Sequence, residues 1–140
     1  MTQATSEARV TRDEETGEVS IVINITPQPT PRPRVAKFGT YYPATYKAYI
    51  KELDAMIPPA AVALEGELLV EVEAVCQPIK KSKFTTPAGD VDNLAKGVLD
   101  MLTKKGFYGD DRQIVDLHVT KRFPRDDEQP HFRISLLEIE

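Results

Sequence analysis

Most of the side chains in this sequence that are suited to chemistry are carboxylates gathered around one predicted helix. In chain order they are Asp90, Asp92, Asp100, Asp110 and Asp111. Asp92, Lys96 and Asp100 are spaced i, i+4, i+8, so on a helix they share one stripe and Lys96 is carried next to the acids. Carboxylate oxygens are the ligands that a hard cation such as Mg²⁺ prefers, so metal-assisted chemistry is the chemistry that this group would suit.

The same residues also have an ordinary structural interpretation. An aspartate before a helix is the usual N-cap, Asp110 and Asp111 are typical of a turn, and Lys96 with Asp100 is a routine exposed ion pair. The two ends of the helix meet in one site only if helix and strand pack with the acids at the same edge. A calcium loop starting at Asp90 is excluded, because Leu94 and Ala95 stand where that loop needs an oxygen ligand and a glycine.

Alternation and helical spacing predict six elements that would position these acids. Alternating apolar residues predict strands over 19–26, 67–77, 113–123 and 132–139. Apolar residues at helical spacing predict helices over 43–57 and 93–105. Gly106 is placed as the C-cap of the second helix. The order β-α-β-α-β-β predicts an α+β domain with one mixed sheet and helices packed on it.

Length and composition favour a single soluble globular domain. The 140 residues are 41% hydrophobic and 29% charged, which is enough for one core. Residues 1–18 are expected to be a flexible acidic tail or a short strand extension, and residues 19–140 the domain. We expect no membrane segment and no targeting leader, hence a cytoplasmic location. The single cysteine, Cys76, cannot form an internal disulfide and is expected in the core.

The positive charge is concentrated, although 18 basic and 22 acidic residues give a net charge of −4. Residues 24–51 contain no acid and several basic side chains, which is the footprint of a polyanion-binding surface. Phe38, Tyr41 and Tyr42 are available to stack on unpaired bases, whereas Tyr46 and Tyr49 are expected in the core. The candidate phosphate contacts are Arg32, Arg34, Lys37, Lys80, Lys81, Lys83 and Lys121.

Two segments around the acids carry a resemblance to a known family. Residues 89–102 read GDVDNLAKGVLDML and residues 106–116 read GFYGDDRQIVD, followed by Lys121. Together they strongly resemble the signature of the RusA-type Holliday junction resolvases. The upstream Arg32, Arg34 and Val35 among prolines, followed by Tyr-x-Pro43, resemble the phage or prophage branch of that family. The resemblance covers roughly residues 19–138 and implies a RusA-like fold.

The resemblance implies the roles of the acids and the lysine. Asp90, Asp92 and Asp111 would be the catalytic metal ligands and Lys96 would be needed for cleavage. Asp110 is expected to be an outer or alternative ligand and Asp100 to orient Lys96. The implied cofactor is Mg²⁺, with Mn²⁺ as the alternative ion. These roles suit phosphodiester hydrolysis, which needs a metal ion and a cation facing the growing phosphoryl charge.

The implied protein is a homodimeric endodeoxyribonuclease of the bacterial cytoplasm. It would resolve Holliday junctions and related branched DNA by paired symmetric nicks, in recombination and repair. One alternative is a catalytically silent protein that binds branched DNA. Another is a structural or interaction domain with an incidental acid cluster, which would show no salt-dependent DNA binding.

Overall fold

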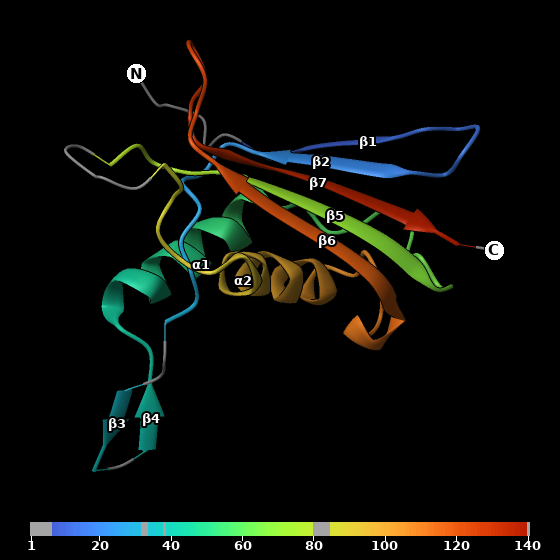
Figure 1. Cartoon of the computed structure of the whole chain (residues 1–140). Helices are drawn as coiled ribbons and strands as arrows, with labels where there is room; N and C mark the ends of the chain where they lie inside the picture. Colours follow the sequence, from blue (N-terminus) through green and yellow to red (C-terminus); the bar gives the residue numbers. More distant parts are fainter. Residues whose placement is uncertain (1–6, 32–33, 38, 80–84, 140) are drawn as a thin grey trace, which may run out of the picture.

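One five-stranded sheet carries both helices on the same face (Figure 1). The computed structural model describes residues 7–31, 34–37, 39–79 and 85–139, with only the backbone of Arg34 and Ala36. In chain order the elements are β1 (Arg9–Arg12), β2 (Val19–Ile23), β3 (Arg34–Ala36), β4 (Gly39–Tyr41), α1 (Ala44–Met56), β5 (Leu68–Val75), α2 (Val91–Lys104), the 3₁₀ helix η1 (Asp111–Gln113), β6 (Ile114–Arg122) and β7 (His131–Glu138).

The strand order is β1-β2-β7-β5-β6, which leaves β6 at one edge. β5 and β6 are parallel, and α2 is the crossover between them. The remaining neighbours pair antiparallel. The predicted α+β fold with one mixed sheet is therefore confirmed, and the six predicted elements correspond to β2, α1, β5, α2, β6 and β7.

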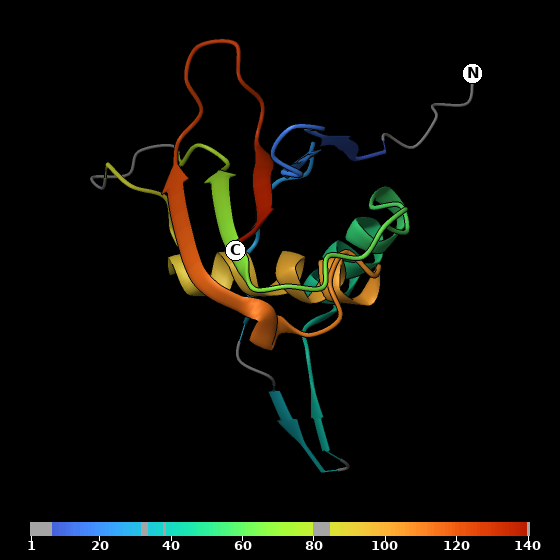
Figure 2. The ribbon, with the colours of Figure 1, turned by 90° about the vertical axis from the view of Figure 1, so that its right-hand side faces the viewer.

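The core lies between the sheet and the two helices (Figure 2). On β5 the buried side chains alternate, with Val70 and Val72 at most 1% exposed. The matching face of α2 buries Leu94, Val98 and Leu102, as helical spacing predicts. Cys76 is also buried, as expected for a small core residue. None of the helices in the described ranges is long and apolar enough to cross a bilayer.

Two apolar residues of β6 are left uncovered, although the alternation of this strand is the one that the sequence predicts. Leu117 is the register partner of the fully buried Val70, so both side chains share the helix-bearing face of the sheet. Nevertheless Leu117 is 45% exposed and Val115 is 55% exposed. β6 is the edge strand of the sheet, and α2 leaves these two side chains exposed.

Two strand pairings lie outside the six predicted elements. β1 pairs with β2, so the strand extension considered for residues 1–18 is present at Arg9–Arg12, while residues 1–6 lie outside the described part. Because residues 9–12 are a sheet strand, they are not part of a flexible tail. The division into a tail and a domain is otherwise still a prediction. β3 and β4 form a hairpin that projects away from the sheet and helices (Figures 1 and 2).

The Pro-rich segment before this hairpin runs without regular structure through residue 31, as alternate prolines predict. This segment is nevertheless hydrogen-bonded to the two helices. The Thr30 amide donates to the Asn93 carbonyl over 2.9 Å, and the Thr30 hydroxyl lies 2.8 Å from the Tyr46 hydroxyl. The start of the predicted arm therefore packs beside the first turn of α2.

A glycine allows α1 and α2 to approach closely. A Cβ atom at Gly97 would lie 2.8 Å from the Tyr46 hydroxyl oxygen and 3.3 Å from Ile50 Cδ1. Further along, hydrogen bonding from Lys104 and Lys105 to Asp54, over 2.8 and 2.6 Å, ties the helices together and lowers the Asp54 pKa to about 2. Glycine lowers the helix propensity of α2, but because it has no side chain it lets the two helices pack closely.

We expect Gly97→Ala to lower the free energy of unfolding by about 1–2 kcal/mol, because the clash with Tyr46 outweighs the propensity gained. In a Tyr46→Phe background the clashing oxygen is absent. There the same substitution should be neutral or stabilising. Urea unfolding of the four variants of this cycle measures the coupling. Equal effects of Gly97→Ala in both backgrounds would contradict the close contact.

Candidate active site

The start of α2 presents two exposed carboxylates. Asp90 occupies the N-cap position, but its side chain makes no capping hydrogen bond to the helix. Asp92 follows in the first turn and is also exposed. Asp90 therefore stands at the N-cap position without making the side-chain hydrogen bond that an ordinary N-cap residue makes. Both carboxylates lie at the positive end of the helix dipole.

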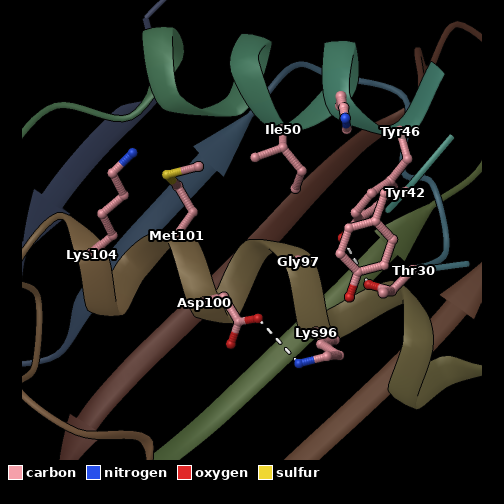
Figure 3. A pocket seen from close by; sticks show the side chains of 10 residues that line it. Thr30, Tyr42, Tyr46, Ile50, Lys96, Gly97, Asp100, Met101 and Lys104 are labelled. Atoms are coloured by element: carbon pink, nitrogen blue, oxygen red, sulfur yellow. Dashed lines mark hydrogen bonds and ion pairs between the residues drawn. The ribbon is translucent and has the colours of Figure 1, made fainter. Parts of the chain in front are cut away.

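Lys96 and Asp100 form the ion pair that their spacing predicts. Lys96 Nζ lies 3.2 Å from Asp100 Oδ2, and their side chains are 54% and 62% exposed (Figure 3). The hydrogen bond from Lys96 to Asp100 raises the lysine pKa above its usual value. Lys96 therefore carries a positive charge at neutral pH and is held in a defined direction.

The turn after α2 is fixed by Gln113. Its side-chain oxygen accepts from the amides of Gly109 and Asp110, over 2.9 and 3.1 Å. Its side-chain amide donates to the carbonyls of Leu64 and Gly66, over 2.9 and 3.0 Å. These four hydrogen bonds join the turn just before Asp111 to the segment that contains Leu64 and Gly66. Gln113 was missed as a site residue, and its spacing of three from Asp110 is the capping-box signal that identifies it.

Asp110 forms the other half of that capping box. Its carboxylate accepts from the Arg112 amide over 2.8 Å, and this hydrogen bond is the main cause of its lowered pKa. Asp110 is accordingly occupied in capping η1. Asp111, the next residue, is exposed at the start of η1.

A groove of about 330 Å³ brings part of the predicted site together. It joins the Lys96 and Asp100 stripe of α2 to Asp111 and to the exposed apolar face of β6. Its lining residues are Lys96, Leu99, Asp100, Asp111, Ile114, Val115 and Leu117. Asp90 and Asp92 are not among them. Asp92 precedes Asp100 by two helical turns, a rise of about 12 Å.

The expected single cluster of metal ligands is therefore not formed within one chain. In the ranges that the structure describes, no three acidic, histidine or cysteine side chains are arranged to hold a metal ion. The donors are nevertheless of the right kind, because exposed carboxylates suit Mg²⁺ and Asp90 is not used for capping. Each chain carries the candidate residues in two separate groups, Asp90 with Asp92 and Asp111 beside Lys96, and we call these two groups half-sites.

Lys121, which the sequence predicts to contact phosphate, binds the backbone before Asp90 in the structure. Its Nζ donates to the carbonyls of Pro87 and Gly89, over 2.9 and 2.7 Å. Gly89 has a φ of 92°, a conformation that favours glycine. The lysine on β6 thus holds the peptide that leads into α2, and we interpret it as a positioning residue.

The remaining predicted DNA contacts are only partly described. Lys37 is exposed in the turn between β3 and β4. The backbone of Arg34 begins β3. Arg32, Lys80, Lys81 and Lys83 lie outside the described residues, as does Phe38. The basic cluster therefore stays a prediction from sequence.

Comparison with known proteins finds one consistent relationship. The family model for endodeoxyribonuclease RusA matches residues 24–136. A crossover junction endodeoxyribonuclease RusA from Shigella sonnei is 32% identical over 83 residues, which are 59% of this chain and 64% of that protein. The protein of the same name from Escherichia coli K12 shows the same identity and coverage. The match thus spans less than two thirds of the length of these curated relatives.

We expect Lys121→Met to lower the free energy of unfolding by about 1–3 kcal/mol, because two carbonyls lose a charged donor. The slope of log affinity for DNA against log salt should stay unchanged. A phosphate-contacting lysine would instead reduce that slope by about 1 and leave stability intact. Lys51→Met, at an exposed position of α1, is the control for stability. Unfolding and binding titrations at several salt concentrations separate the two roles.

Proposed function

Because the chain belongs to the RusA endodeoxyribonuclease family, we propose that it resolves Holliday junctions and related branched DNA by paired symmetric nicks, in recombination and repair. The observation that supports this most is the groove that is lined by both Asp111 and Lys96, whose ammonium group is paired with Asp100. The named relatives are bacterial. We therefore also propose that the reaction takes place in the cytoplasm of a bacterial host, and from the sequence resemblance we propose a phage or prophage origin.

Asp90, Asp92 and Asp111 are proposed to hold Mg²⁺, or Mn²⁺ as the alternative ion, through carboxylate oxygens. When bound, the ion activates water and neutralises charge on the phosphodiester. Lys96 stabilises the negative charge that grows on the phosphoryl oxygens, and it is protonated because its pKa is raised. Asp100 positions Lys96, and Asp110 positions Asp111 by capping η1.

The substrate is proposed to be gripped by the basic side chains outside this site. Each one neutralises a phosphate and releases counterions, so binding is expected to weaken as salt rises. The set comprises Arg32, Arg34, Lys37, Lys80, Lys81 and Lys83.

The two half-sites are the reason for proposing a homodimer. β6 pairs with β5 along one edge only, and its other edge is a row of open backbone groups nine residues long. Beside this edge lie the exposed side chains of Val115 and Leu117. An open edge with adjacent apolar side chains is the feature that a second strand covers. A second copy of this chain is the proposed occupant.

Antiparallel pairing of two β6 strands would place complementary half-sites together. The beginning of β6 follows Asp111 directly. Near its other end, Lys121 contacts the carbonyl of Gly89, the residue before Asp90. In an antiparallel pair the beginning of one strand lies beside the end of the other. Asp111 of one protomer would therefore approach Asp90 and Asp92 of its partner, twice per dimer.

This arrangement accounts for paired nicks. A two-fold dimer carries two equivalent sites, and a four-way junction is itself approximately two-fold symmetric. Two strands of like polarity would then be cut by the same chemistry. A monomer with separated half-sites would cut neither.

We expect Asp90→Asn, Asp92→Asn and Asp111→Asn each to abolish cleavage of a synthetic four-way junction in Mg²⁺, because each removes a ligand charge. Junction affinity in gel-shift titrations should be retained, since the basic side chains are unchanged. Asp126→Asn, an exposed acid between β6 and β7, is the matched control and should cleave normally. If the unmodified protein binds the junction without cleaving it, the silent-binder alternative replaces the nuclease.

We expect Lys96→Ala to slow cleavage by about 100-fold or more, because its charge acts on the transition state. Junction affinity should change by less than about threefold. Single-turnover kinetics at saturating enzyme make this comparison. Asp100→Asn, which only releases the lysine, should slow cleavage much less. Normal cleavage by Lys96→Ala would reduce the lysine to the exposed partner of Asp100.

We expect Leu117→Glu to convert the dimer to a monomer and to stop cleavage, because the charge would be buried at the proposed interface. Light scattering after gel filtration gives the mass, and circular dichroism checks the fold. Val10→Glu, an exposed valine on the opposite edge strand β1, is the control and should leave both mass and cleavage unchanged. A dimer that survives Leu117→Glu would move the interface away from β6.

A further inference from the structure

A second cavity lies between α1 and α2 (Figure 3), and it shares Lys96 and Asp100 with the groove that contains Asp111. Its volume of about 360 Å³ is within the range of small-molecule sites. Ile50, Gly97 and Met101 form an apolar floor, and two tyrosines and three lysines surround it. The complete lining is Thr30, Tyr42, Tyr46, Lys47, Ile50, Lys96, Gly97, Asp100, Met101 and Lys104.

The aromatic wall of this cavity is rigid on one side and accessible on the other. The rings of Tyr42 and Tyr46 lie 5.2 Å apart between centroids. Tyr46 is buried, and the Thr30 hydroxyl lies 2.8 Å from its own hydroxyl. Tyr42 is half-buried and packs against that fixed ring. A planar ligand entering the cavity would therefore meet an ordered aromatic surface, which is the surface on which nucleobases stack.

The rim of the cavity carries three lysines, two of which are paired with acids. Lys47 is exposed on α1, and Lys96 and Lys104 extend from α2. Asp100 is the one acid among the lining residues, and Lys96 compensates its charge at 3.2 Å. Lys104 lies 2.8 Å from Asp54. Lys47 therefore supplies the net positive charge of the rim. An apolar, aromatic interior beside an exposed lysine is complementary to a base attached to a phosphate.

We propose that this cavity receives one unpaired nucleotide of the DNA substrate, with its base against Tyr42 and its phosphate toward Lys47. The proposal rests on the proposed function for the source of the nucleotide. Lys96 and Asp100 line both this cavity and the groove that contains Asp111. A strand crossing the proposed catalytic groove therefore passes the mouth of the cavity, and a crossover offers nucleotides that are easily unstacked.

The first test uses free ligands and does not depend on nuclease activity. Amide chemical shifts of ¹⁵N-labelled protein are followed with deoxyadenosine monophosphate, deoxyribose 5-phosphate and inorganic phosphate, each at millimolar concentration. Deoxyadenosine monophosphate should shift the amides of Ile50, Gly97 and Met101, and the two ligands without a base should not. Equal shifts with deoxyribose 5-phosphate, or none with the nucleotide, would overturn the base site.

The second test measures junction affinity in the Asp92→Asn background, so that cleavage does not interfere. Tyr42→Ala should weaken binding of a four-way junction about tenfold, and Tyr42→Phe should bind like the parent. Affinity for a linear duplex should not change. Val62→Ala is the control, because Val62 is an exposed apolar residue that does not line the cavity and is not a candidate DNA contact.

Lys47→Ala tests the rim with little risk to folding, since the side chain is exposed. It should weaken junction binding about threefold and lower the salt slope by about 1, whereas Lys51→Ala, one turn further along α1, should not. Nucleotide-induced shifts combined with unchanged junction affinity of Tyr42→Ala and Lys47→Ala would mean that a free nucleotide, and not DNA, fills the cavity. That result would overturn the proposal and leave the nuclease assignment standing.

Discussion

The rigid length of α2 determines where every proposed catalytic group lies. The helix has 14 residues and is therefore about 21 Å long. It carries Asp90 and Asp92 at its start, Lys96 and Asp100 on one exposed stripe, and the turn with Asp111 at its far end. Because a helix does not bend to bring its ends together, one chain presents two half-sites. The homodimer proposed here is the simplest way to unite them.

The parallel crossover gives that proposal its geometry. In a β-α-β unit the helix runs antiparallel to its strands, so the start of α2 lies near the end of β6 and its far end near the start of β6. Lys121 fixes the connection that leads into α2 by binding the carbonyl of Gly89. Gln113 fixes the turn between α2 and β6 by accepting a hydrogen bond from the Asp110 amide. The open edge between them is thus flanked by one half-site at each end.

The periodicity of the sequence was sufficient to predict the helices and strands, but not to predict which strands lie next to each other in the sheet. Each predicted helix and strand is present, because burial of an apolar face leaves a clear 3.6- or 2-residue period. Strand order is set by packing, so the exposure of Val115 and Leu117 could not be read from an alternation that looks like any core strand. Only the position of β6 at the sheet edge explains it.

The sequence was sufficient to predict which residues belong to the candidate site, but not how these residues are arranged in space. Spacing placed Lys96 beside Asp100, and the structure has that pair. The separation of Asp92 from Asp111 follows from the helix length combined with the direction of the turn, and the second is a tertiary property. The role of Lys121 was missed for a related reason: its partners are backbone carbonyls, and no side-chain pattern marks them.

The most direct test of the shared site is to mix two inactive variants. Asp90→Asn and Asp111→Asn protomers are allowed to exchange subunits, and nicking of a four-way junction is measured in Mg²⁺. If each site combines residues of two protomers, the mixed dimer has one doubly substituted site and one intact site, and nicking of one strand should return. If each site lies within one chain, both sites of the mixed dimer are defective. A mixture that stays inactive, with heterodimers verified by native mass spectrometry, would contradict the shared site.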